Sequence, residues 1–126
     1  MLVRFPPGSA AVVVRAHAAP YADPISVRAG EAVQPDPARS AETDILGWLW
    51  CRAADRREGW VPEAWLDADS RLLRDFDAIE LSVEPGERVA IELAESGFVL
   101  CRKPDGGRGW LPDGVLRLDV LLSWRA

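Results

Sequence analysis

Two segments of equal length, fifty positions apart, align without a gap in this sequence. Residues 47–66 read GWLWCRAADRREGWVPEAWL, and residues 97–116 read GFVLCRKPDGGRGWLPDGVL. Self-similarity at a fixed period predicts one structural unit built twice. The identical pairs include Cys51 with Cys101, Gly59 with Gly109, Trp60 with Trp110 and Pro62 with Pro112.

The repeat continues upstream, where the spacing between the copies changes. Residues 14–17 match residues 73–76, and residues 26–33 match residues 82–89. The first copy is three residues longer between these blocks and six residues longer before Gly47, and such length changes are typical of surface loops. We therefore expect an N-terminal extension at 1–11, a first domain at 12–67, a second domain at 71–118 and a C-terminal tail at 119–126.

Short apolar or alternating runs bounded by turn residues dominate both copies, as in AAVVVRAH, WLWCRA and FVLCRK. Ten Pro and ten Gly in 126 residues indicate many turns. The segments DRRE and PDGGR have the character of hairpin turns, although only the second contains the favourable Asp-Gly pair. No segment shows helical periodicity beyond about two turns, so the sequence predicts an all-β fold.

The second copy contains LLRDFDAIELSVEPGERV, with an Asp-Phe strand end, a Glu-Leu-Ser segment and a Gly-Glu turn. The first copy contains GWLWCR and EGWVPEAWL, with Gly-Trp, Gly-Trp-Val-Pro and a following aromatic residue. In these motifs each copy resembles a Src homology 3 (SH3) domain. The resemblance covers residues 12–118 and implies two tandem five-stranded barrels packed together, as in small bacterial proteins of this type.

Members of this family commonly bind Pro-rich peptides in a groove of aromatic rings, which fit the ridges of the left-handed extended helix. In the first copy, the resemblance assigns Trp48, Pro62 and Trp65 to this groove. Arg15 and His17 stand where the family has two tyrosines, and Tyr21 is available to supply a ring. The second copy has a poorer groove, because Arg74 and Val115 take aromatic positions and the remaining members are Phe76, Phe98 and Pro112.

Acidic residues accompany the aromatic ones in the loops of the first copy, at Asp23, Asp36, Glu42 and Asp44. Carboxylates beside an aromatic ring suit a basic peptide, whereas acidic loop residues that are merely solvated would have no such role. The predicted function is therefore binding of a peptide or protein segment, with a Pro-rich or basic ligand. The expected binding residues are His17, Tyr21, Asp23, Asp44, Trp48, Trp50, Pro62 and Trp65, with weaker contributions from Phe76, Phe98 and Pro112.

Alternation along a strand places Trp48 and Trp50 on one face and Cys51 on the other. We assign Cys51 and Cys101 to the cores of the two barrels, so Trp48 and Trp50 are expected on an outer, uncovered face. That face would contact either a ligand or the neighbouring barrel, and the sequence does not decide between them. Trp60 and its matched residue in the second copy are expected within the barrels.

Several classes of function have little support in the sequence. Two Cys and one His do not make a zinc ligand set, no catalytic constellation has the required spacing, and no cofactor is expected. A net charge of −5 with scattered basic residues disfavours nucleic acid binding. No apolar run is long enough to span a membrane. Free buried thiols and the lack of a convincing signal peptide favour the cytoplasm.

Two alternatives remain from other classes. The apolar tail at 119–126, with Leu121, Leu122 and Trp124, would allow the chain to associate with itself as a structural subunit. The tail would equally pack on its own barrels and close the groove. A cell-wall binding barrel is the second alternative, and it would require export and a cleft in which sugars stack.

Overall fold

The computed structural model describes residues 5–43 and 45–119, which form short strands and one short helix. This mostly β content agrees with the predicted all-β class. In chain order the elements are β1 (Ala10–Val13), β2 (Ser26–Val27), β3 (Gln34–Pro35), α1 (Pro37–Ser40), β4 (Trp48–Arg52), β5 (Glu58–Pro62), the 3-10 turn η1 (Glu63–Trp65), β6 (Phe76–Asp77), β7 (Arg88–Glu95), β8 (Phe98–Arg102), β9 (Arg108–Pro112), the 3-10 turn η2 (Asp113–Val115) and β10 (Leu116–Leu118).

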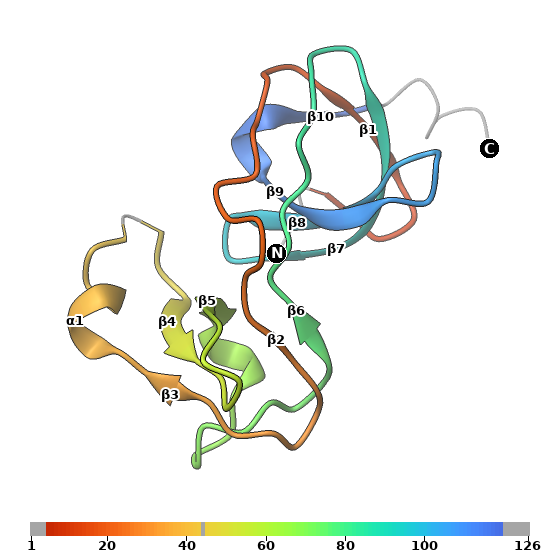
Figure 1. Ribbon diagram of the computed structural model, residues 1–126. Helices are drawn as coiled ribbons and strands as arrows, with labels where there is room; N and C mark the ends of the chain where they lie inside the picture. The colour runs from red at the N-terminus through yellow and green to blue at the C-terminus, as the bar shows by residue number, and fades with distance from the viewer. Residues whose placement is uncertain (1–4, 44, 120–126) are drawn as a thin grey trace. The chain divides into compact units, whose positions relative to one another are not determined.

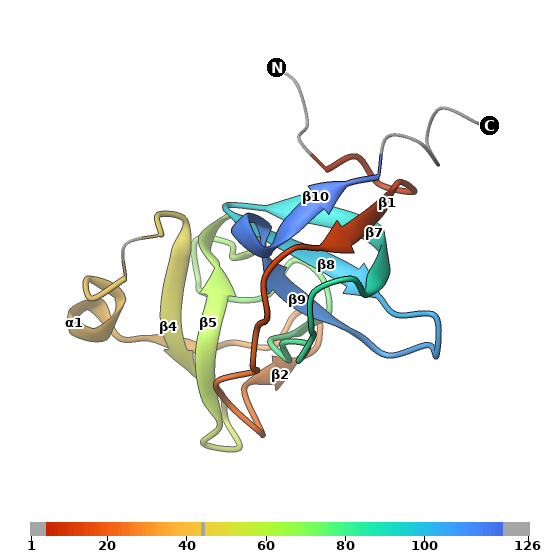
Figure 2. The same ribbon diagram turned by 90° about the horizontal axis from the view of Figure 1, so that it is seen from above.

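The chain divides into two compact units that do not coincide with the two sequence copies. Unit 1 combines the residues up to Pro20 with those from Glu80 onward, and unit 2 comprises Tyr21–Ile79. The expected division at 12–67 and 71–118 differs from this one, because the first strand of each copy lies in the unit of the other copy. Figures 1 and 2 show β1, near the N-terminus, beside β10 at the other end of the chain.

Unit 1 contains a five-stranded sheet in the order β10-β1-β7-β8-β9. Strand β1 lies between two strands of the second copy and is antiparallel to both, with Val12 opposite Arg117 on one side and Arg88 on the other. Beyond β1, the backbone N–H of His17 donates to the carbonyl of Val83, and the N–H of Val83 donates to the carbonyl of His17. The segment that follows β1 therefore pairs with the segment that precedes β7. The apolar core of this unit includes Phe5, Val13, Val99, Cys101 and Leu111.

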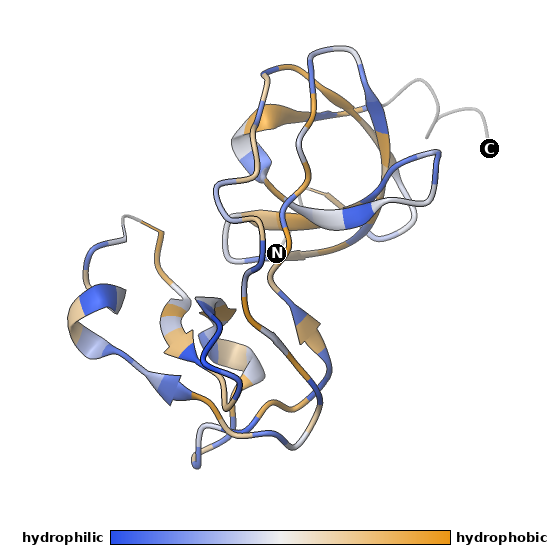
Figure 3. Ribbon diagram, in the orientation of Figure 1, coloured by the Kyte–Doolittle hydropathy of each residue, from blue (hydrophilic) through white to orange (hydrophobic). Residues whose placement is uncertain are grey.

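Unit 2 contains the three-stranded sheet β3-β4-β5 and the two-stranded sheet β2-β6. Its fully buried side chains include Ile25, Cys51 and Val61. The segment that opens the second copy belongs here, because Leu72 is 2% exposed and forms an isolated antiparallel bridge with Leu66. Figure 3 shows apolar segments along the strands and hydrophilic segments in α1 and the loops.

A short turn explains why the copies exchange their first strands. Residues 67–70 join the end of the first copy to the start of the second, where Leu66 and Leu72 form an isolated antiparallel bridge, and the Asp67 carboxylate accepts the backbone N–H groups of Asp69 and Arg71. Extended segments joined by so short a connection pair with each other, since closing a short loop costs little entropy. Leu72 therefore takes the place beside Leu66. The first strand of the chain then pairs with β10, where the matching place is open.

Both predicted hairpins are present, at β4-β5 and at β8-β9. The two turns match across the repeat, since Arg56 donates its backbone N–H to Ala53 and Gly106 donates to Lys103. Gly106 has a φ of 93°, and Arg56 adopts a φ of 74° in the turn without Gly. A positive φ is unfavourable for a residue with a side chain, so the first turn holds backbone strain that the second avoids.

A cysteine pair distinguishes exchanged strands from contiguous copies. Val12→Cys with Arg117→Cys is expected to form a disulfide, because these residues face each other across β1 and β10 and such pairs lie about 5.5 Å apart between Cα atoms. The pair should stabilise the chain by about 2–4 kcal/mol, measured by denaturant unfolding. The control, Val12→Cys with Asp67→Cys, would bridge only if each copy kept its own first strand. Burial raises the pKa of the native thiols Cys51 and Cys101 to about 12, so they compete little.

Candidate functional site

Six aromatic side chains of unit 2 form two groups of ring contacts, one around Phe76 and one around Trp50, and we call the two groups together the aromatic row. At one end Phe76 lies between two indoles, 5.5 Å from Trp65 and 6.3 Å from Trp48 between ring centroids. Trp50 follows Trp48 on the same face of β4. The row ends in two rings that contact Trp50: Trp60 at 5.2 Å and Tyr21 at 5.6 Å between centroids.

The exchanged strand decides which predicted groove residues meet. Phe76 comes from the second copy, where it was expected beside Phe98 and Pro112, yet it packs against Trp48 and Trp65 of the first copy. Phe98 and Pro112 lie in unit 1, as does His17. The sequence analysis assigned one set of groove residues to each copy. In the structure, the set in unit 2 combines residues of both copies. Pro62, fully buried opposite Trp48, stays in unit 2.

The prediction that Trp48 and Trp50 lie on an uncovered face is wrong. Their exposed fractions are 7% and 8%, and Trp65 is 9% exposed. One cause is a pair of arginine side chains that lie over the indoles. The Arg39 Cζ atom lies 4.4 Å from a Trp50 ring centroid, and the Arg74 Cζ atom lies 4.4 Å from one of Trp65. Among large apolar side chains of this unit, Tyr21, Leu46 and Leu73 remain exposed.

Arg39 reaches Trp50 because the loop inserted in the first copy folds as the helix α1. Asp36 caps this helix by accepting the N–H of Arg39, at 3.0 Å, and Pro37 stands at its first position. Ser40 then accepts the N–H of Trp50 through its hydroxyl oxygen, at 2.8 Å, beyond the point where β3 stops pairing with β4. The sequence analysis missed this helix, although an Asp followed by Pro is a recognisable helix start.

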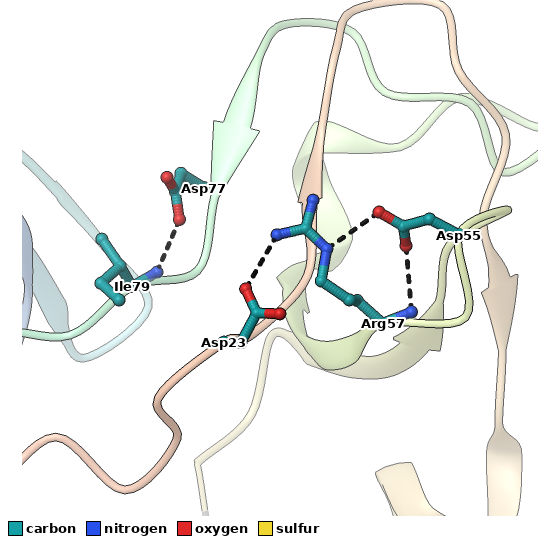
Figure 4. Close-up of polar contacts among 5 residues, drawn as sticks. All are labelled: Asp23, Asp55, Arg57, Asp77 and Ile79. Atoms are coloured by element: carbon teal, nitrogen blue, oxygen red, sulfur yellow. Dashed lines mark hydrogen bonds and ion pairs between the residues drawn. The ribbon is translucent and has the colours of Figure 1, made fainter.

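The acidic residues predicted near the rings have different environments. Asp23 is paired with Arg57 across 3.1 Å, and the same guanidinium binds Asp55 at 2.8 Å (Figure 4). Hydrogen bonds from the backbone N–H and the side chain of Arg57 lower the pKa of Asp55. Asp44 lies outside the described residues. The sequence analysis also missed Glu58, whose Oε1 accepts the indole N–H of Trp50 at 3.0 Å.

Charge is distributed unequally between the units. Unit 2 holds twelve Asp and Glu against seven Arg, a net charge of −5, counted over residues 21–79. The remaining residues hold eight acidic and eight basic side chains, so the whole net charge of the chain belongs to unit 2. Unit 2 therefore attracts cations more strongly than unit 1 does.

In unit 1 a polar pair takes the place of the rings. His17 matches Phe76 in the repeat, and its Nε2 atom lies 2.8 Å from Oε1 of Glu80. Burial raises the pKa of Glu80, and the hydrogen bond and charge of His17 partly offset the rise. Phe98 and Pro112 are half-buried in this unit. The sequence predicted no partner for His17, because Glu80 is 63 positions away.

Other chemistries find no counterpart in the described residues. These residues contain no cluster of three or more His, Cys, Asp or Glu side chains able to hold a metal ion. Within the same ranges, no helix has the length and hydropathy needed to cross a membrane. Cys51 and Cys101 are both buried and free, as predicted. The apolar residues expected to form a docking tail, Leu121, Leu122 and Trp124, fall outside the described part of the chain.

Comparison with known families supports an SH3-like domain in the first half of the chain. Residues 10–68 match the model of the variant SH3 domain. The matched segment runs from unit 1 into unit 2, so it includes a first strand that pairs with the second copy. Neither the curated proteins nor the solved structures provide a match.

Substitution of Phe76 tests which indoles it supports. Phe76→Ala removes a ring that is 3% exposed and is expected to cost about 3–5 kcal/mol of unfolding free energy. Phe76→Leu keeps most of the volume and should leave the chain folded. In that variant the indole N–H signals of Trp48 and Trp65 should shift in NMR spectra, while that of Trp110 should not. A shift confined to Trp110 would contradict the observed packing.

The buried carboxyl of Glu80 predicts a pH-dependent effect. Its pKa in the folded chain lies above the ordinary value of 4.5, so the stability this group contributes is complete below that pH and is lost as pH rises through the raised value. The melting temperature of Glu80→Gln relative to wild type should therefore rise as the pH is increased from below 4.5 through the raised pKa. Glu87→Gln is the opposite control, because the backbone N–H of Glu84 lowers the pKa of Glu87. Parallel pH profiles for the two variants would refute the assignment.

Proposed function

We propose that the SH3-like domain of this chain is a protein-interaction module, and that unit 2 presents the face that binds a basic segment of a partner. SH3-like domains generally bind peptide or protein segments, which supports the general class. The charge distribution carries the more specific proposal, since the entire net charge of −5 falls in the unit that also holds the aromatic row. No catalytic step is part of this function.

The side chains available for contact in unit 2 combine apolar and acidic character. Tyr21, Leu46 and Leu73 are exposed by 37%, 86% and 61%. The side chain of Asp23 is 80% exposed even though it pairs with Arg57, so a partner's cation can reach the same carboxylate. A segment with apolar residues beside Arg or Lys fits this surface. Proline is compatible with such a segment, because Pro-rich peptides adopt an extended backbone that keeps the side chains apart.

The polar composition of the two units argues against other partners. Nucleic acids require a concentrated basic face, and unit 2 is acidic while unit 1 is neutral overall. Both cysteines are free and buried, which suits a reducing compartment such as the cytoplasm. The proposed partner is therefore a cytoplasmic protein with an accessible basic, apolar segment.

Peptides that differ only in charge test this function. A fluorescent peptide with Arg and Lys among Pro and Leu residues should bind more tightly than its counterpart with Glu in place of the basic residues. Its affinity should fall as salt rises, because about 0.1 M salt screens charges beyond about 10 Å. Equal binding of the two peptides, or binding that does not depend on salt, would contradict the proposal.

A variant pair locates the binding face. Tyr21→Ala is expected to weaken binding of the basic peptide about fivefold to thirtyfold, since exposed aromatic residues often dominate interfaces. Val14→Ala is the matched control, because Val14 is an exposed apolar residue of unit 1. Fluorescence anisotropy measures both variants. A larger loss from Val14→Ala would move the binding face to unit 1.

A further inference from the structure

We infer that Arg39 occupies a cation-binding site on Trp50 as an internal ligand, and that an arginine side chain of the partner displaces it. This inference rests on the proposed function and adds the identity of one recognised residue and the element that competes for its place. The geometry, the partners of Arg39 and the comparison between the two copies support it independently.

The environment of Trp50 is suited to a flat cation. The guanidinium carbon of Arg39 lies 4.4 Å from an indole ring centroid, within the range of a cation–π contact. Two more rings contact the same indole, Tyr21 at 59° to its plane and Trp60 at 76°. Glu58 adds a carboxylate that accepts the indole N–H at 3.0 Å. Rings and a carboxylate around one indole stabilise a positive charge placed upon it.

The site holds Arg39 with few specific bonds. Its only ion pair in the described part of the chain is with Glu42, at 3.6 Å, and both side chains are substantially exposed. Its Nε atom is buried and has no hydrogen-bond partner there. An unpaired buried donor weakens the bound state. A guanidinium supplied by a partner can approach with its N–H groups directed to exposed acceptors, so it can replace Arg39.

Comparison of the copies shows that the parts of this site occur together. In the second copy Leu100 matches Trp50 and Arg108 matches Glu58, so both the ring and the carboxylate are missing. The inserted loop that contains α1 and Arg39 is also missing from that copy. The copy that has the insertion is thus also the copy that has the indole of Trp50 and the carboxylate of Glu58, and the insertion places the Arg39 guanidinium over that indole. A loop that merely lengthened the surface would not require the other two changes.

Arginine is the ligand that this site fits best. The site already accommodates a guanidinium over an indole, and a planar guanidinium stacks on aromatic faces better than a hydrated ammonium does. Arg74 over Trp65 is a second stack at the other end of the aromatic row. We assign the exchangeable position to Arg39, because the indole under it also donates its N–H to the carboxylate of Glu58 and because the Arg39 Nε atom has no hydrogen-bond partner in the described part of the chain.

Removal of Arg39 should open the site. The test titrates a capped peptide that has one arginine among apolar residues, and the same peptide with neutral citrulline in place of the arginine. Arg39→Gln should bind the arginine peptide roughly threefold to tenfold more tightly than wild type does, because the internal competitor is gone. Arg28→Gln is the matched control, since it removes the same charge from an exposed position of the same unit. The control should leave the affinity near that of wild type.

The indole N–H signal of Trp50 reports the site directly. In NMR spectra of Arg39→Gln it should shift on addition of the arginine peptide and stay in place with the citrulline peptide. If the arginine peptide binds Arg39→Gln and Arg28→Gln equally, or binds without moving the Trp50 signal, the inference is wrong while the proposed function stands. If folded wild type and folded Arg39→Gln bind neither this peptide nor the basic peptide, the proposed function fails too. Circular dichroism establishes that each variant is folded.

Discussion

The turn at residues 67–70 is the constraint on which the rest of the structure depends. Because it joins two neighbouring extended segments directly, the pairing of Leu66 with Leu72 forms with a small loss of entropy. That local pairing places the first strand of the second copy in unit 2. The first strand of the chain is then free to complete the sheet of unit 1, where it pairs with β10 and β7. Each sheet system thus depends on a segment of the other copy.

The exchange also determines the composition of the candidate site. Trp48 and Trp65 of the first copy meet Phe76 of the second, and their contacts contribute to burying all three rings. In unit 1 the position of Phe76 is taken by His17, which pairs with Glu80. One unit therefore uses rings where the other uses a hydrogen-bonded polar pair. The acidic charge of unit 2 reinforces this difference between the two.

Arginine side chains give the aromatic row its present surface. Arg39 and Arg74 cover indoles that would otherwise expose large apolar faces, and each keeps part of its own side chain in water. A guanidinium on an indole at the surface is held by a contact worth only about 0.5–1 kcal/mol. The proposed binding at such a surface would need displacement of a side chain and no rearrangement of the strands.

The sequence by itself determined the repeat, the short strands, both hairpins, the burial of Cys51 and Cys101 and the SH3 resemblance, since these follow from patterns local to each strand. It also identified most residues of the aromatic row. Only the tertiary structure decided that Phe76 joins Trp48, that His17 joins Glu80 and that Arg39 covers Trp50. The physical reason is that equivalent strands of two similar copies fit either sheet, so the choice depends on the connecting turn and not on the strands themselves.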